Sequence, residues 1–295
     1  MINKLVNVFD IHIMSSKIAI AVSGGLDSIV LMNLAKLSNK IDTKSIHILI
    51  VDHGLRKNSK DEAFFAKQEA GKLGFKSKIL TWKGKKPTTK IQETARNSRY
   101  DLLFDYCRKN DISDLFIAHH LDDQIENFIF RMFRGSGIKG LTSFSNIYKI
   151  DDINIIRPLI EIPKSDLLIF AEEQKLKWIE DISNSNLAFD RVKIRNALNS
   201  FYKNGFDKKL FLKSINKLKS INEDLDFIAD DYVKKYIKFN DNIFVSIDKN
   251  FFFVAPKEIQ MRVIKNCISF FAPEKPYPPK DTKIINLMKW IKNNQ

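Results

Sequence analysis

A small polar loop follows the first strongly apolar run of the sequence, residues 17–22, and precedes a stretch whose apolar residues recur at helical spacing. Two adjacent glycines let backbone N–H groups point inward, and the start of the next helix adds a partial positive charge, so the loop is suited to hold a polyphosphate. Asp27 is an unusual neighbour for an anion, and we expect it to act through a bridging Mg²⁺. A helix-cap role for Ser23 or Asp27 is the alternative, which an isolated SGG would favour. The loop consists of Ser23, Gly24, Gly25, Leu26, Asp27 and Ser28.

Three acidic side chains stand at the start of another predicted helix, residues 121–133. Asp122 and Glu126 are four positions apart and share a face, and Asp123 lies beside Glu126. Like charges at this spacing repel one another, so the cluster predicts a bound cation, either Mg²⁺ or an ammonium group. A solvated acidic helix start is the alternative. Together with Asp27, these three residues are the candidate catalytic groups.

Two histidines, His119 and His120, directly precede the acidic cluster. Neighbouring residues at the end of a strand rarely point to one centre, so the pair is poorly placed to bind one zinc ion. We expect both histidines to line an active site instead. The two cysteines, Cys107 and Cys267, have no close partner, which excludes a disulfide framework, a zinc knuckle and a CxxC redox pair.

The chain carries 49 Lys and Arg residues against 35 Asp and Glu, and its formal net charge of +14 would attract a polyanion such as nucleic acid. An A/T-rich genome is a second source of lysine, because Lys, Ile, Asn and Phe are all abundant. The basic residues concentrate in two segments, 72–90 and 191–219. No apolar run approaches the ~20 residues of a membrane span, and the N-terminus lacks a signal-peptide cleavage site. We therefore expect a cytoplasmic protein without a membrane partner.

Two other glycine patterns test rival nucleotide sites. Residues 135–140 (GSGIKG) satisfy the dinucleotide pattern GxGxxG, but they follow a predicted helix rather than a strand, so the required context is missing. The Walker pattern GxxxxGK[ST] fails as well, because Leu141 occupies the lysine position. Neither a Rossmann dinucleotide site nor a Walker P-loop is expected.

Short β-rich runs alternate with helical patterns through the first half of the chain, which predicts an α/β fold with a parallel sheet covered by helices on both faces. Strands are expected at 17–22, 46–51, 77–82 and 114–118, and helices at 27–37, 58–73, 90–107 and 121–133. Ligands of such sheets bind beyond the carboxyl ends of the strands, where the phosphate loop and the acidic cluster both lie. We place a domain boundary between residues 205 and 206, and expect residues 206–295 to be mainly helical.

The loop SGGLDS resembles the PP-loop of the N-type ATP pyrophosphatases, a superfamily with an adenine-nucleotide α-hydrolase-like fold. Further motifs resemble the tRNA(Ile)-lysidine synthetase family within it, in that family's order and over residues 17–196. HHLDDQIE (119–126) followed by RGSGIKGL (134–141) is the most specific match, and VDHGLR (51–56) and QETARNSRY (92–100) support it. RVKIR (191–195) resembles the family's RNRIR element, although Val192 and Lys193 depart from it. The chain looks like a short form, without the second C-terminal β domain of longer members.

The resemblance implies that the chain cleaves ATP between its α and β phosphates, with Mg²⁺, to adenylate the wobble cytidine of a minor isoleucine tRNA that has a CAU anticodon. L-lysine would then replace AMP, with the acidic cluster holding the amino acid, and residues 206–295 would bind tRNA. A homodimer is compatible with the sequence. Contacts to lysine or tRNA are also expected for His119, His120, Arg96, Arg99, Arg134, Arg191 and Arg195. For Arg96 and Arg99, the phosphates of ATP are the alternative partner.

Two alternatives to this activity remain open from the sequence. A PP-loop tRNA thiolase would normally use cysteines to carry sulfur or a metal cluster, and Cys107 and Cys267 are too few and too far apart. A non-catalytic tRNA-binding protein could descend from the enzyme, although the retained Asp27, Asp122, Asp123 and Glu126 argue against it.

Overall fold

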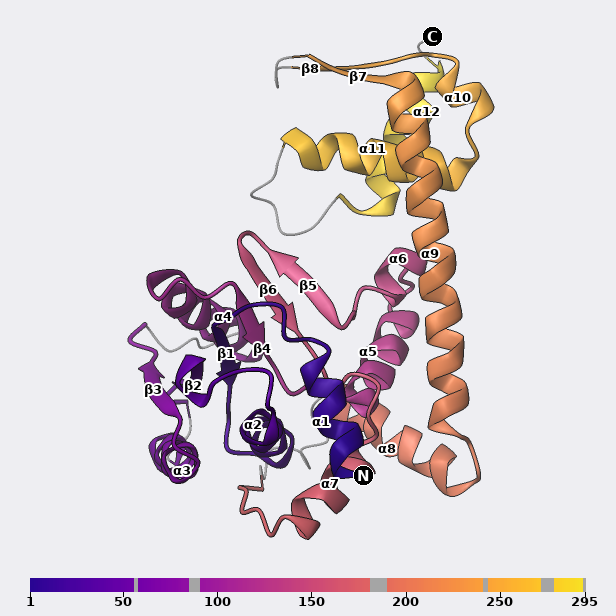
Figure 1. Ribbon diagram of the computed structural model, residues 1–295. Coiled ribbons are helices and arrows are strands. Elements are labelled where there is room, and N and C mark those ends of the chain that lie inside the picture. The colour runs from indigo at the N-terminus through magenta and orange to yellow at the C-terminus, as the bar shows by residue number, and fades with distance from the viewer. Residues whose placement is uncertain (56–57, 85–90, 181–189, 241–243, 272–278, 294–295) are drawn as a thin grey trace. The chain divides into compact units, whose positions relative to one another are not determined.

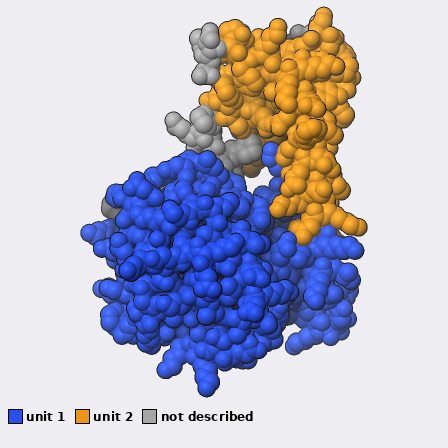
Figure 2. All heavy atoms as spheres, in the orientation of Figure 1, with its two compact units in different colours: residues 1–213 blue, residues 214–295 orange. Residues whose placement is uncertain are grey.

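The computed structural model describes residues 1–55, 58–84, 91–180, 190–240, 244–271 and 279–293. They form two compact units, Met1–Lys213 and Ser214–Gln295 (Figure 2). The division falls inside helix α9 (Lys208–Tyr236), whereas the predicted domain boundary lies just before that helix. Within the described part, no helix combines the length and the apolar character needed to cross a bilayer. Two features that the sequence indicated lie outside the described residues: Arg56 of the VDHGLR motif and the part of the first basic segment at 85–90.

A six-stranded sheet with the order β3-β2-β1-β4-β6-β5 forms the centre of the first unit (Figure 1). All neighbouring strands are parallel except β5 and β6, which form an antiparallel hairpin at one edge. The sequence did not predict this hairpin, whose turn places Asp151 at a φ of 51°, a conformation that aspartate tolerates better than most residues. The strands are β1 (Ile18–Ala21), β2 (Ile46–Asp52), β3 (Lys76–Thr81), β4 (Asp114–Phe116), β5 (Ile147–Ile150) and β6 (Ile153–Ile156).

Helices cover both faces of the sheet, because alternate residues of its strands point to opposite sides. One face carries Ile18 and Ile20 and packs against α1 (Ile2–Asp10), α2 (Leu26–Leu37), α3 (Ser59–Lys72) and α7 (Lys164–Glu173). The other face carries Ala19 and Leu115 and packs against α4 (Ile91–Lys109). Strand β1 is almost fully buried, as its unbroken apolar sequence requires of a central parallel strand. The predicted α/β class and its two helical layers are confirmed.

Strands β1 and β4 flank the point at which the chain changes direction across the sheet. From β1 the chain proceeds to β2 and β3 on one side, and it then returns to place β4 on the other side of β1. Ile20 of β1 is paired with Phe116 of β4, so the loops after these two strands emerge next to each other. This is the position at which open α/β sheets bind ligands. It brings the loop at residues 23–28 and the segment at 119–126 to one place.

Helix α5 (Leu121–Phe133) follows β4 and packs against α8 (Asp190–Lys203), while the short helix α6 (Ile138–Leu141) and the 3-10 turn η1 (Thr43–Ser45) complete the described helices of this unit before α9. The GSGIKG segment therefore begins just after a helix, as predicted, and not after a strand. Only the first two turns of α5 enter the core, so Met132 near its end is 46% exposed.

The second unit is mainly helical, as predicted, and has its own hydrophobic core. It contains the end of α9, the hairpin of β7 (Ile237–Asn240) and β8 (Phe244–Ile247), and helices α10 (Phe251–Val254), α11 (Lys257–Phe271) and α12 (Asp281–Asn293). Strand β7 was not predicted. Phe251 and Phe252 are buried in this core, whereas Phe253 is 75% exposed because the short helix α10 turns it outward.

Candidate active site

The phosphate loop is held open by two backbone features. Gly24 has a φ of 89°, a conformation that favours glycine, and its carbonyl accepts a hydrogen bond from the backbone N–H of Ile179 at 2.9 Å. Ser28 ties the loop together, since its hydroxyl donates to the Gly25 carbonyl at 2.9 Å and accepts from the Ser23 backbone N–H at 3.2 Å. No side chain caps α2, so the alternative role of Ser23 or Asp27 as a helix cap is excluded. The N–H groups in the first turn of α2 have no partners within the helix, as in sites that bind phosphate.

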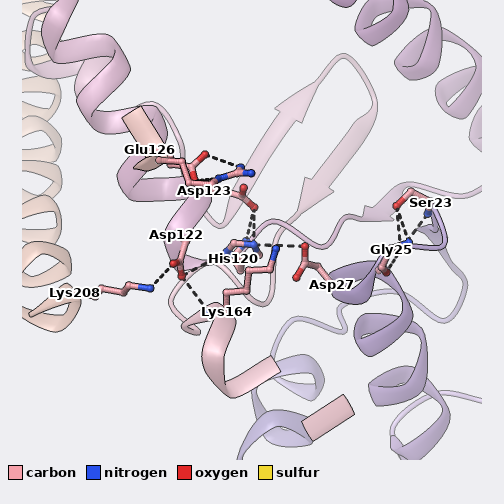
Figure 3. A network of polar contacts seen from close by, with 11 residues as sticks. Ser23, Gly25, Asp27, His120, Asp122, Asp123, Glu126, Lys164 and Lys208 are labelled. Atoms are coloured by element: carbon pink, nitrogen blue, oxygen red, sulfur yellow. Dashed lines mark hydrogen bonds and ion pairs between the residues drawn. The ribbon is translucent and has the colours of Figure 1, made fainter. Parts of the chain in front are cut away.

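His120 connects this loop with the acidic helix (Figure 3). Its Nε2 lies 3.5 Å from Asp27 Oδ2 and 3.5 Å from Asp123 Oδ2, and its Nδ1 lies 3.8 Å from Asp122 Oδ2. Burial alone would lower the pKa of His120, but Asp123, Asp27 and Asp122 outweigh it, so the pKa lies above its ordinary value. Burial would raise the pKa of Asp27, yet contact with His120 and the charge of Lys164 lower it below its ordinary value. His120 therefore links helices α2 and α5, and the surrounding carboxylates favour its protonated form.

Asp122 is bound from two other elements. Its Oδ2 accepts a hydrogen bond from the backbone N–H of Lys164 at 3.0 Å, and its Oδ1 accepts one from the ammonium group of Lys208, at the start of α9. Lys208 also lies over the ring of Tyr202, 4.6 Å from its centroid. Burial would raise the pKa of Asp122, but the contacts with Lys208, Lys164 and His120 lower it. Asp122 is therefore ionised and already paired with a cation of the chain itself.

Glu126 is buried on α5 and is paired with Arg195 of α8. The guanidinium donates from Nε to Oε1 at 2.6 Å and from Nη2 to Oε2 at 3.0 Å. This contact with Glu126 raises the pKa of Arg195, although burial opposes it. The acidic cluster is thus not a solvated helix start, because described cations of the same unit pair with two of its three carboxylates.

A pocket of about 150 Å³ lies between these groups. Carboxylates and cationic groups both line it, so it is suited to a zwitterion better than to a simple ion. Two buried polar atoms near it, Asp27 Oδ1 and the Tyr202 hydroxyl, have no hydrogen-bond partner within the described residues. Burial, together with Asp122 and Glu126, raises the pKa of Tyr202 to about 12, so this hydroxyl is neutral. The lining residues are His120, Asp122, Glu126, Lys164, Arg195, Leu198, Asn199 and Tyr202.

His119 does not line this pocket, although both histidines were expected to line an active site, because successive residues of an extended segment point to opposite sides. Its Nδ1 accepts a hydrogen bond from Arg157 Nε at 3.2 Å, and its ring lies 5.1 Å from that of Phe144. Arg96 and Arg99 of α4 lie on the same side, and both pack over the ring of Tyr100, at 5.2 and 5.7 Å from its centroid.

The predicted site residues thus fall into three groups. Asp27, His120, the three acidic residues of α5 and Arg195 form the pocket region, while His119, Arg96 and Arg99 lie on the α4 side of the sheet. Arg134 and Arg191 form the third group, around Phe130, and are exposed; their guanidinium carbons lie 4.0 and 5.8 Å from the centroid of that ring. Arg134 also lies 3.7 Å from Asp190.

Four residues of the site were not singled out from the sequence. Lys208 counted only as one member of a basic segment, and Tyr202 follows the last recognisable motif. Lys164 was not considered, whereas Arg157 had a usable signal, since it comes directly after a strand that ends at the same edge as β1 and β4. This signal was missed because β6 was not predicted to be a strand.

Comparisons with known proteins agree with this geometry. The family model of a PP-loop domain matches residues 1–201. The chain is 37% identical over 259 residues to the tRNA(Ile)-lysidine synthase of Orientia tsutsugamushi (strain Boryong), covering 84% of this chain and 58% of that protein. It is 34% identical over 280 residues to the tRNA(Ile)-lysidine synthase of Wolbachia sp. subsp. Brugia malayi (strain TRS), covering 94% and 64% respectively. The chain therefore spans less than two thirds of the length of these relatives.

Among solved structures, the U34-tRNA thiolase NcsA from Methanococcus maripaludis with its [4Fe-4S] cluster is similar, with a TM-score of 0.63, 20% sequence identity, and coverage of 75% of this chain and 78% of that one. At this identity the likeness concerns the fold alone. The family model, the loop after β1 and the position of that loop at the sheet's edge all agree, and the chain belongs to the PP-loop family of ATP-binding domains.

Proposed function

We propose that this chain ligates L-lysine to C2 of the wobble cytidine in the CAU anticodon of a minor isoleucine tRNA, using ATP and releasing AMP and pyrophosphate. The observation that carries this proposal is the direct link through Asp27 and His120 between the phosphate loop and a pocket of mixed charge. The two relatives named tRNA(Ile)-lysidine synthase support the same activity.

The reaction has two steps at one site. The C2 oxygen of cytidine attacks the α-phosphate of ATP, and pyrophosphate leaves along the loop after β1, where backbone N–H groups stabilise its charge. The ε-amino group of lysine then attacks C2, AMP leaves with the oxygen, and the amine gives up a proton. The pocket must therefore present the lysine close to the phosphate loop. His120 connects the pocket with the loop, because it contacts both Asp123 of α5 and Asp27 of the loop.

The pocket offers both kinds of partner that a free amino acid needs. Carboxylates of α5 suit its ammonium groups, and Arg195 and Lys164 suit its carboxylate. The neutral hydroxyl of Tyr202 supplies a further hydrogen bond, because it is buried without a partner in the described structure. Lysine fits this mixture better than a purely cationic or anionic ligand.

Mg²⁺ fits the same loop. Asp27 Oδ1 is buried without a hydrogen-bond partner among the described residues, and Mg²⁺ is commonly held by one or two carboxylates together with substrate phosphates. Within the described part, no group of three or more His, Cys, Asp or Glu side chains forms a metal cage. Asp27 and the phosphates of ATP would therefore hold the ion, which would neutralise charge on the leaving pyrophosphate.

We further propose that residues 1–205 carry catalysis and that residues 206–295 contribute to tRNA binding. The net charge of +14 supports a nucleic-acid partner.

A labelling experiment tests the activity. The full chain, incubated with ATP, Mg²⁺, labelled lysine and unmodified isoleucine tRNA with a CAU anticodon, is expected to transfer the label to the anticodon nucleotide. Transfer of sulfur or of another amino acid instead would contradict the substrate assignment. Methionine tRNA, which shares the anticodon CAU, serves as the control RNA.

A thiolase is the nearest alternative enzyme, and cysteine placement argues against it. Cys107 is buried beneath the sheet in the core on the α4 face, and burial raises its pKa to about 12, so it stays a protonated thiol. Cys267 is buried in the core of the second unit. Both thiols are buried, whereas a sulfur-carrying cysteine must be accessible to its partners.

A non-catalytic tRNA-binding protein is the alternative from another class. Asp27→Ala is expected to abolish AMP formation while tRNA is still retained on a filter. Normal turnover by this variant would contradict the metal-linked role of Asp27.

A further inference from the structure

Arg157 is a buried cation whose contacts are all neutral. The residue is 5% exposed, and its guanidinium donates to His119 Nδ1 at 3.2 Å and from Nη1 to the Ser145 carbonyl at 2.7 Å. It also lies near the side chain of Tyr100 and 4.6 Å from the centroid of the Phe144 ring. Burial lowers the pKa of Arg157, and nearby Arg96 lowers it further, but a guanidinium remains charged at neutral pH. A buried charge of this kind normally requires an opposite charge nearby.

Arg96 and Arg99 extend the same positive region. Both lower the pKa of His119. Like Arg157, neither is paired with a carboxylate within the described residues. Arg108, farther along α4, differs from them because Asp151 and Asp152 bind it at 3.0 and 3.1 Å. Among the arginines of α4, the two without a carboxylate partner in the described structure therefore lie toward the end of the helix that faces the carboxyl edge of the sheet.

His119 is neutral and has one donor left. The Nε of an arginine can only donate, so Nδ1 of His119 must accept, and the ring proton is on Nε2. Burial, then Arg157, Arg96 and Arg99, holds the pKa of His119 well below its ordinary value. The cluster therefore presents cations and a neutral N–H donor, which is the chemistry that binds a phosphate oxygen.

The position of the cluster separates it from the triphosphate of ATP. The loop for that triphosphate follows β1 and leads into α2, which covers one face of the sheet. His119 follows β4, Arg157 follows β6, and the arginines of α4 cover the other face. Neighbouring strands are ~4.8 Å apart, so Arg157 emerges about 10 Å along the edge from β1. The cluster therefore lies apart from the loop that is expected to hold the triphosphate.

We propose that Arg96, Arg99 and His119, with Arg157 as the positioning residue behind His119, form a site for a backbone phosphodiester of the RNA substrate. The identity of the ligand, an RNA phosphodiester, rests on the proposed function. Arg96 is exposed and gives the phosphate access, whereas Arg157 acts through the ring that it orients.

The test measures binding of unmodified tRNA to the full chain at several salt concentrations, and binding of ATP separately. Arg96→Ala is expected to weaken tRNA binding about tenfold and to reduce the slope of log affinity against log salt by about one unit. His119→Asn keeps an acceptor for Arg157 but removes the distal N–H, so it should weaken tRNA binding without changing the slope. ATP affinity should stay unchanged in both variants. Arg108→Ala, on the same helix, is the matched control and should change neither measurement.

Three outcomes overturn the proposal. If Arg96→Ala weakens ATP binding but not tRNA binding, the phosphate belongs to the nucleotide. If Arg96→Ala binds both ligands as the unaltered chain does, the site does not exist, and the proposed ligase activity is unaffected. If the unaltered chain binds no tRNA, the proposed function fails together with this site. Binding without lysine incorporation would instead leave the site standing and remove the ligase.

Discussion

Arg195 holds Glu126 through two parallel hydrogen bonds, from Nε to Oε1 at 2.6 Å and from Nη2 to Oε2 at 3.0 Å. The carboxylate side chain is only 7% exposed, whereas the guanidinium side chain is 34% exposed. The pair also joins α8 to α5, so it fixes one wall of the pocket as well as neutralising a buried charge.

Arg195→Ala is therefore expected to lower the free energy of unfolding by about 3 kcal/mol, because it leaves Glu126 buried without its ion partner. Arg195→Lys should recover part of this loss, since it restores the charge but not the bidentate pair of hydrogen bonds. Denaturant unfolding measures both. Arg191→Ala, an exposed arginine of the same helix, is the control and should change the free energy of unfolding by less than about 0.5 kcal/mol. An equal loss of unfolding free energy in the two alanine variants would show that the pair of Arg195 and Glu126 contributes no more stability than an exposed arginine.

Gly24 provides a second prediction, because its φ of 89° is required for the phosphate loop. Gly24→Ala should cost about 1–2 kcal/mol of folding free energy and weaken ATP binding, since the strained loop can no longer direct its N–H groups inward. Equilibrium binding of ATP and thermal unfolding measure the two effects.

The control for Gly24 is Gly71, inside α3. A Cβ at Gly71 meets nothing within 4 Å, so Gly71→Ala should stabilise the chain by about 0.5–1 kcal/mol through helix propensity alone. Unchanged ATP affinity in Gly24→Ala would contradict the role of the loop conformation.

His119 predicts how stability depends on pH. Its pKa in the folded chain is well below 6.5, because of burial and the charges of Arg157, Arg96 and Arg99. As the pH falls through ~6.5, the unfolded chain gains a proton that the folded chain rejects, so this residue reduces stability on the acidic side and has no effect above pH ~7.5. The slope contributed by one such group cannot exceed about 1.4 kcal/mol per pH unit.

His119→Asn should remove this contribution, because asparagine accepts the Arg157 hydrogen bond but does not titrate. Unfolding free energies measured between pH 5 and 8 for both chains give the difference. A variant with the same pH profile as the unaltered chain would show that His119 becomes protonated freely in the folded state.

The sequence predicted most of the sheet and the components of the site, for a physical reason. Central parallel strands are buried on both faces, so β1 and β2 appear as continuous apolar runs, and catalytic groups gather at their carboxyl ends. The hairpin β5–β6 was missed for two reasons: the residues of the edge strand β5 are mostly exposed, and the buried strand β6 is only four residues long.

The pairing inside the site could not be predicted in the same way. Lys208 and Asp122 are 86 positions apart, and Arg195 and Glu126 are 69 apart, so only the fold decides that they meet. The motif also suggested that the carboxylates would be vacant for an external cation. Instead, Lys208 and Arg195 already pair with two of them. The ammonium group of an incoming amino acid would therefore compete with a cation of the chain itself.

Lys208 is the residue that tests this competition. Its ammonium group binds Asp122 and lies over Tyr202, where the ammonium group of a bound lysine would also find a carboxylate and an aromatic ring. Removing it vacates Asp122 without altering the phosphate loop. Lys208→Met keeps most of the apolar stem and should therefore lower the KM for lysine several-fold, while the KM for ATP stays the same. Lys209→Met, the neighbouring lysine, is the matched control and should leave both constants unchanged. A higher KM for lysine in Lys208→Met would mean that Lys208 binds the carboxylate of the substrate and does not compete with its ammonium group.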